Sequence, residues 1–209
     1  MMQSQVADTI SLGNDILGFI GRSNIWVEDS LVNRDSVRFT QLLMAKALEE
    51  TAPGQLEMLV FDDALKGMAA PFQEVNSGGE KILHHINDTQ ELTETIHHLH
   101  EHIQAVLNVI QGRTESLLDF RQLSPKVEGF KLVVLSTDYE LLSDEIKDKL
   151  TVLLKAGPAA GVTFLIHSMT LDVNELVLGL SQQCQVDRNT ILDERSGVRG
   201  RFDPLSADE

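Results

Sequence analysis

Residues 131–166 read KLVVLSTDYELLSDEIKDKLTVLLKAGPAAGVTFLI. The stretch opens and closes with short runs, 131–135 and 162–166, that are almost continuously apolar and rich in β-branched side chains, a pattern typical of strands buried on both faces of a parallel sheet. Between them, residues 143–155 repeat leucine and isoleucine at helical spacing, and a Gly-Pro pair ends that helix. The stretch therefore predicts a strand-helix-strand unit of a layered α/β protein.

The same alternation extends in both directions along the chain. Further strands are predicted at residues 24–27 and 56–61, and further helices at residues 36–50, 89–111 and 172–183. We expect one domain over residues 1–209 with a three-layer α/β/α architecture and a mostly parallel sheet. Its core spans about residues 11–200, and the tail at 195–209 shows no periodicity and is expected to be irregular.

Composition excludes several functional classes. Asp and Glu number 32 against 17 Lys and Arg, so the net charge is −15, and DNA is expected to be bound weakly or only through partners. Cys184 is the only cysteine, which rules out an intramolecular disulfide, and we expect it to be a small buried residue. No apolar run approaches the roughly 18 residues of a membrane span, so we expect a cytoplasmic protein without membrane insertion.

Four segments follow one another along the chain: SLGNDILG at residues 11–18, QLEMLVFD at 55–62, GPAAGVTFLI at 157–166 and DRNTILD at 187–193. In their order and spacing they resemble the motor domain of the FtsK/SpoIIIE DNA translocases, the HerA/FtsK branch of the RecA-like P-loop ATPases. The resemblance implies a RecA-like P-loop fold. It also implies a module of a ring-forming assembly, with neighbouring ATPase domains or other proteins as partners.

The phosphate-binding loop of that family is degenerate here. Where the family carries the Walker A sequence GxxGxGKS, this chain has DSLVNRDS at residues 29–36, including Asn33 and Arg34. Only Ser36 is retained. Asp29 stands in the first glycine position and Asp35 in the lysine position, so two negative charges lie where the resemblance places a phosphate.

The other catalytic positions have changed as well. Thr137 and Asp138 occupy the Walker B Asp-Glu positions, Met169 the position of the sensor glutamine, and Pro158 that of an arginine. The resemblance therefore implies a pseudo-ATPase, with no cofactor expected, that serves as a structural or partner-binding module of a translocase or secretion assembly. The alternative is a divergent active translocase subunit that binds ATP and Mg²⁺, uses Asp138 as base and receives Lys or Arg in trans.

Three other groups of residues have two interpretations each. His98 and His102 are one helical turn apart and could share a metal ion, although a solvated helix face explains them more simply. The pair Asp62-Asp63 follows a strand, where it either binds a ligand or starts a loop.

The third group is a cluster of arginines near the C-terminus. Such a cluster either contacts a partner, a neighbouring nucleotide or a DNA phosphate, or pairs with the acids around it. Its members are Arg188, Arg195, Arg199 and Arg201.

Overall fold

The computed structural model describes residues 19–30, 34–77, 80–124, 129–171, 173–188, 190–193 and 199–201. Within this part of the chain the strands form an eight-stranded sheet in the order β10-β9-β8-β1-β7-β6-β2-β5. The strands from β8 to β5 pair in parallel, and β9 and β10 continue the sheet in antiparallel fashion. The strands are β1 Asn24–Glu28, β2 Leu56–Asp62, β5 Leu83–Ile86, β6 Phe130–Ser136, β7 Val162–Ser168, β8 Ser181–Asp187, β9 Thr190–Asp193 and β10 Arg199–Arg201.

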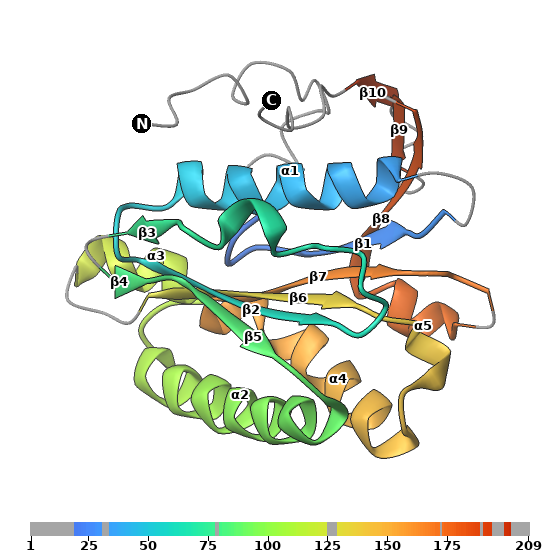
Figure 1. The fold of residues 1–209 in the computed structure, drawn as a ribbon. Coiled ribbons are helices and arrows are strands. Elements are labelled where there is room, and N and C mark those ends of the chain that lie inside the picture. The colour runs from blue at the N-terminus through green and yellow to red at the C-terminus, as the bar shows by residue number, and fades with distance from the viewer. Residues whose placement is uncertain are drawn as a thin grey trace.

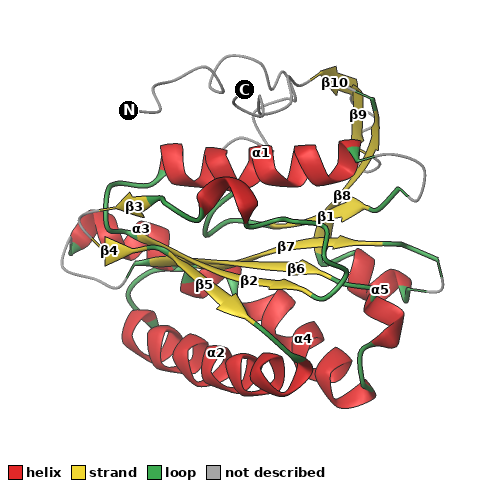
Figure 2. Ribbon diagram, in the orientation of Figure 1, coloured by secondary structure: helices red, strands yellow, loops and turns green. Residues whose placement is uncertain are grey.

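Helices cover both faces of this sheet (Figure 1). Helix α1 (Asp35–Glu50) lies on one face, and α2 (Thr89–Ile110) and α4 (Asp144–Ala156) lie on the other. Figure 2 shows the resulting helix, sheet and helix layers, which confirm the predicted three-layer α/β/α fold. The shorter elements are α3 Leu117–Leu123, α5 Glu175–Leu178, three 3₁₀ turns at Ala70–Phe72, Tyr139–Leu141 and Pro158–Ala160, and a small hairpin of β3 Asn76–Ser77 and β4 Glu80–Lys81.

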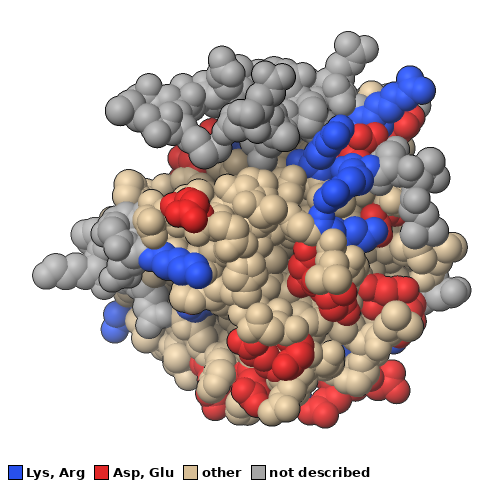
Figure 3. Space-filling view, in the orientation of Figure 1, with Lys and Arg blue, Asp and Glu red and all other residues tan. Residues whose placement is uncertain are grey.

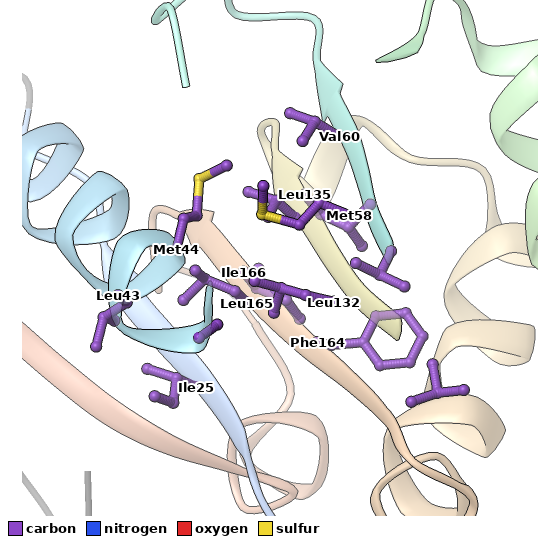
Figure 4. Packing of buried hydrophobic residues seen from close by; sticks show 14 of the residues in the cluster. Ile25, Leu43, Met44, Met58, Val60, Leu132, Leu135, Phe164, Leu165 and Ile166 are labelled. Atoms are coloured by element: carbon purple, nitrogen blue, oxygen red, sulfur yellow. The ribbon is translucent and has the colours of Figure 1, made fainter. Parts of the chain in front are cut away.

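The apolar runs form the core as predicted. Every residue of β7 is buried, and β6 is buried except at its second residue, Lys131, as expected for central strands with helices on both sides. Figure 4 shows how side chains of α1 gather with those of β1, β2, β6 and β7 in one cluster. Helix α2, which was predicted at residues 89–111, adds a stripe of buried side chains from Leu92 to Ile110. Asp88 caps the helix by accepting a hydrogen bond from the N–H of Glu91 at 2.8 Å.

The turn that joins α4 to β7 requires its glycines. Gly161 has φ 78°, and a Cβ there would lie 2.5 Å from Cδ2 of Leu117. A Cβ at Gly157 would lie 2.7 Å from the carbonyl oxygens of Leu153 and Val162. The chain therefore passes between helix and sheet with no room for a side chain at either position.

The C-terminal third corrects two predictions. The helix predicted at residues 172–183 is wrong: α5 covers only Glu175–Leu178, and Ser181–Asp187 is strand β8 beside β1. Gly179 follows the short helix, and β8 places only Ser181 and Cys184 in fully buried positions, so it lacks the apolar run that marks the other parallel strands. The tail is also not wholly irregular, because Arg199–Arg201 pairs with β9 as strand β10.

Among the helices of the described residues, none is both long and apolar enough to cross a bilayer.

Candidate functional site: the predicted phosphate slot

The parallel strands all end at one edge of the sheet, where ligands usually bind in folds of this kind (Figure 1). The structure brings the predicted positions together there. Asp29 follows β1, Ser36 lies in the first turn of α1, Thr137 and Asp138 follow β6, and Met169 follows β7. Asn33 lies outside the described residues.

Asp29 is held by two basic side chains of the chain itself. Its Oδ2 lies 3.0 Å from Nζ of Lys66, and its Oδ1 lies 3.2 Å from Nε2 of His167. Burial raises the pKa of this carboxyl group, but the hydrogen bonds and charges of His167 and Lys66 outweigh that effect and lower the pKa from 3.8 to about 2. Asp29 is therefore a stable anion at the position that the sequence resemblance assigns to the first P-loop glycine.

Ser36, the one residue that matches the Walker A sequence, faces inward. It is fully buried, and its hydroxyl lies 3.0 Å from Nε2 of His167 and 3.4 Å from Oδ1 of Asp29. The other ring nitrogen of His167, Nδ1, lies 3.4 Å from Oγ of Ser136. In P-loop proteins this hydroxyl binds Mg²⁺, whereas here it belongs to an internal network of Asp29, Ser36, His167 and Ser136.

Lys66 reaches the slot from the loop that follows β2. Asp62 shapes this loop, because its carboxylate accepts hydrogen bonds from the N–H groups of Lys66, Gly67 and Met68 at 2.7–3.0 Å. The loop rests on α1, where Arg34 donates to the carbonyl of Lys66 and Gln41 donates to that of Gly67. For Asp62 the structure thus supports the loop-forming interpretation.

The first turn of α1 carries a second negative charge. Asp35 is the first residue of the helix, and Arg38 lies 3.7 Å from its carboxylate. An acid at this end is stabilised by the helix dipole, the same feature that attracts phosphate in P-loop proteins. Arg34 is exposed at the N-cap and makes no capping hydrogen bond with its side chain.

At the predicted Walker B positions, Thr137 and Asp138 both make hydrogen bonds within the chain. Thr137 is buried and donates to Oδ2 of Asp63 at 2.9 Å. Asp138 caps the 3₁₀ turn Tyr139–Leu141 by accepting from the N–H of Glu140 at 3.3 Å. Met169 is half-buried at the end of β7.

The remaining candidate sites are dispersed. His98 is exposed, His102 is half-buried, and the part of the chain that the structure describes contains no group of three His, Cys, Asp or Glu side chains able to hold a metal ion. Arg188 is exposed in the turn between β8 and β9, with φ 54°. Arg199 and Arg201 bound β10, and Arg195 lies outside the described residues.

Sequence reasoning missed the two basic partners of Asp29, Lys66 and His167. A lysine in a loop and a histidine in an apolar strand carry no motif. Only the packing of β1, β7 and the loop after β2 brings their side chains to Asp29.

Several solved structures have a fold similar to that of this chain. ATPases 2 and 3 of EssC from Geobacillus thermodenitrificans match with a TM-score of 0.73 and 12% identity over 90% of this chain and 41% of that one. ATPases 2 and 3 of Thermomonospora curvata EccC in complex with a signal sequence peptide match with a TM-score of 0.65 and 12% identity. This match covers 90% of this chain and 38% of that one. The pCW3 conjugation coupling protein TcpA matches with a TM-score of 0.69 and 11% identity. This match covers 89% of this chain and 62% of that one.

The chain thus has the fold of FtsK/SpoIIIE-type P-loop ATPase domains, and it spans less than two thirds of each of these structures. No protein-family model and no curated protein sequence matches it.

Proposed function

We propose that this chain is a catalytically inactive ATPase domain that serves as a partner-binding module of a translocase or secretion assembly. The observation that carries the proposal is the carboxylate of Asp29, which is paired with Lys66 and His167 at the position of the first P-loop glycine. A nucleotide phosphate would have to displace this carboxylate from Lys66 and His167, or it would be repelled by the negative charge. Two negative charges about 4 Å apart repel each other by roughly 4 kcal/mol at an effective dielectric of 20.

The protein environment of the slot supports the same proposal. Ser36 is fully buried, and Asp138 already caps a turn. The structures with this fold come from secretion and conjugation proteins, and one of them contains a signal sequence peptide. A role in protein binding within such an assembly therefore fits both the slot and the fold.

Thermal unfolding with and without millimolar Mg-ATP tests the inactive site. A ligand that binds only the folded state stabilises it by RT ln(1 + [L]/Kd), and we expect the melting temperature to stay unchanged. A rise of several degrees that Ser36→Ala abolishes would contradict the proposal. Lys149→Ala is the matched control, because Lys149 forms an ion pair with Glu145 on the surface of α4.

A divergent active ATPase is the second candidate, because two displaced groups lie in the slot. Lys66 brings an ammonium group to the degenerate loop, and Asp63 brings a carboxylate to the Walker B position through Thr137. In this candidate, Mg-ATP would displace Asp29 and bind Lys66. The melting shift would then be lost in Lys66→Ala and retained in Lys149→Ala, and hydrolysis would be sought in the assembled complex.

A further inference from the structure

Three leucines are exposed at the carboxyl edge of the sheet, on the side of α4. Leu141 ends the 3₁₀ turn that follows β6, Leu171 lies in the loop after β7, and Leu176 lies in α5. Their exposed fractions are 83%, 71% and 68%. Singly exposed leucines are common, but several at the ends of two neighbouring strands are typical of a protein interface.

The segments that carry these leucines are fixed to the sheet beneath them. The N–H of Tyr139 donates to Oγ of Ser168 at 2.9 Å, which joins the turn after β6 to the end of β7. Nε1 of Trp26 donates to the carbonyl oxygen of Ser168 at 3.2 Å. In α5, Val177 is buried in the core and Leu176 remains outside. Because this backbone is already ordered, binding of a partner there would cost little conformational entropy.

Acidic side chains surround the leucines. Residues 138–149 and 173–178 contain six Asp or Glu and two Lys, which gives these segments a net charge of −4. Both lysines already form ion pairs with glutamates of the same segment, at 3.3 Å for Lys147 and 2.7 Å for Lys149. Figure 3 shows acidic side chains in the region of α5 and the beginning of α4, with few basic ones among them.

Three of these carboxylates are available to a partner. Among the described residues, Asp144, Asp148 and Glu175 form no ion pair with Lys or Arg, and all three are exposed. We call them, together with the three leucines, the acidic leucine patch. Its members are Leu141, Asp144, Asp148, Leu171, Glu175 and Leu176.

The charge of the acidic leucine patch decides which partner fits it. Nucleic acid and the anionic surface of a membrane would be repelled. A second copy of the chain that used the same patch about a two-fold axis would bring a second net charge of −4 against the first. A basic protein segment, by contrast, complements the carboxylates.

We propose that the acidic leucine patch binds a basic segment of another protein, one that carries apolar side chains beside its Lys and Arg. Burial of those side chains against the leucines supplies the affinity, and the carboxylates attract and orient the segment. The proposal rests on the partner-binding role proposed above and adds to it the surface that is used and the chemistry of the partner.

A synthetic amphipathic peptide of leucine and lysine tests the patch, with binding measured by fluorescence anisotropy at about 0.15 M salt. We expect it to bind the unmodified chain. A peptide with serine in place of leucine should bind at least roughly tenfold more weakly, and Leu141→Ser/Leu176→Ser should have a similar effect, because apolar burial is lost in both cases. Leu123→Ser is the matched control, because Leu123 is 71% exposed on α3, at the other end of the strands (Figure 1).

Paired charge variants separate the local match from general attraction to a chain with a net charge of −15. Asp144→Asn/Glu175→Gln removes two carboxylates from the patch. Glu50→Gln/Glu115→Gln removes two exposed carboxylates at the end of α1 and before α3. Because salt screens exposed charges beyond about 8 Å, only the first pair should weaken binding of the peptide. Far-UV circular dichroism checks that every variant is folded.

Several results would overturn the proposal. They are failure of the leucine-lysine peptide to bind, unchanged binding in Leu141→Ser/Leu176→Ser, equal losses in the two charge pairs, and tighter binding of a leucine-glutamate peptide. A dimer in sedimentation velocity that Leu176→Ser dissociates would instead assign the patch to a second copy. Binding to vesicles of phosphatidylcholine and phosphatidylserine that Leu176→Ser abolishes would assign it to a membrane.

These outcomes are independent of nucleotide binding. The thermal experiment with Mg-ATP decides separately whether the domain is inactive, so failure of the peptide to bind leaves that result unchanged. A melting shift with Mg-ATP would likewise leave the peptide result unchanged.

Discussion

At the scale of single residues, the charge of Asp29 has a measurable effect on stability. Because its pKa is 3.8 in model compounds and about 2 in the folded chain, the ionised carboxylate stabilises the fold above pH 4, and this contribution is lost as the pH falls toward 2. The difference between the two values corresponds to about 2 kcal/mol. We expect Asp29→Asn to lower the free energy of unfolding by about this amount at pH 7.

Urea unfolding of both proteins between pH 7 and pH 2.5 measures the effect. The two curves of unfolding free energy against pH should converge in acid. A gap that stays constant across the range would show that the ion pairs with Lys66 and His167 do not lower the pKa of Asp29.

At the scale of elements, the turn between α4 and β7 depends on the space around Gly161. Gly161 and Gly112 have similar backbone angles, φ 78° and 75°, but a Cβ on Gly112 meets nothing within 4 Å, whereas one on Gly161 meets Leu117 and Phe130. Gly112→Ala should therefore cost about 1 kcal/mol, from left-handed strain alone. Gly161→Ala adds overpacking and should cost about 2–4 kcal/mol. If urea titrations show that Gly112→Ala and Gly161→Ala lose the same unfolding free energy, the turn at Gly161 shifts to make room for the added Cβ.

At the scale of the whole molecule, the prediction of one domain can be tested through Trp26. It is the only tryptophan, it is fully buried in β1, and its ring centroid lies 5.4 Å from that of Tyr139. Its fluorescence thus reports on the centre of the sheet, while far-UV circular dichroism reports on all the helices. We expect the two unfolding transitions in urea to coincide. Separate midpoints would indicate two independently unfolding parts.

The sequence predicted the central fold well because parallel strands buried on both faces need uninterrupted apolar runs, as β6 and β7 show. It failed at β8, where a flanking strand uses polar residues such as Gln182 and Gln183 and buries only two side chains fully. The acidic residues at positions 29 and 35 were visible because motif positions are local in sequence. Its partners Lys66 and His167 lie 37 and 138 residues away from Asp29 and could not be found without the packed structure.

The loop after β2 has a mechanical consequence. It is tied to Asp29 through Lys66, and to α1 through Arg34 and Gln41. A motor converts the arrival and departure of a ligand into displacement of the segments around it. In this chain those segments are already tied to one another by their own side chains, so in the proposed inactive role we expect the domain to act as a rigid spacer between its neighbours.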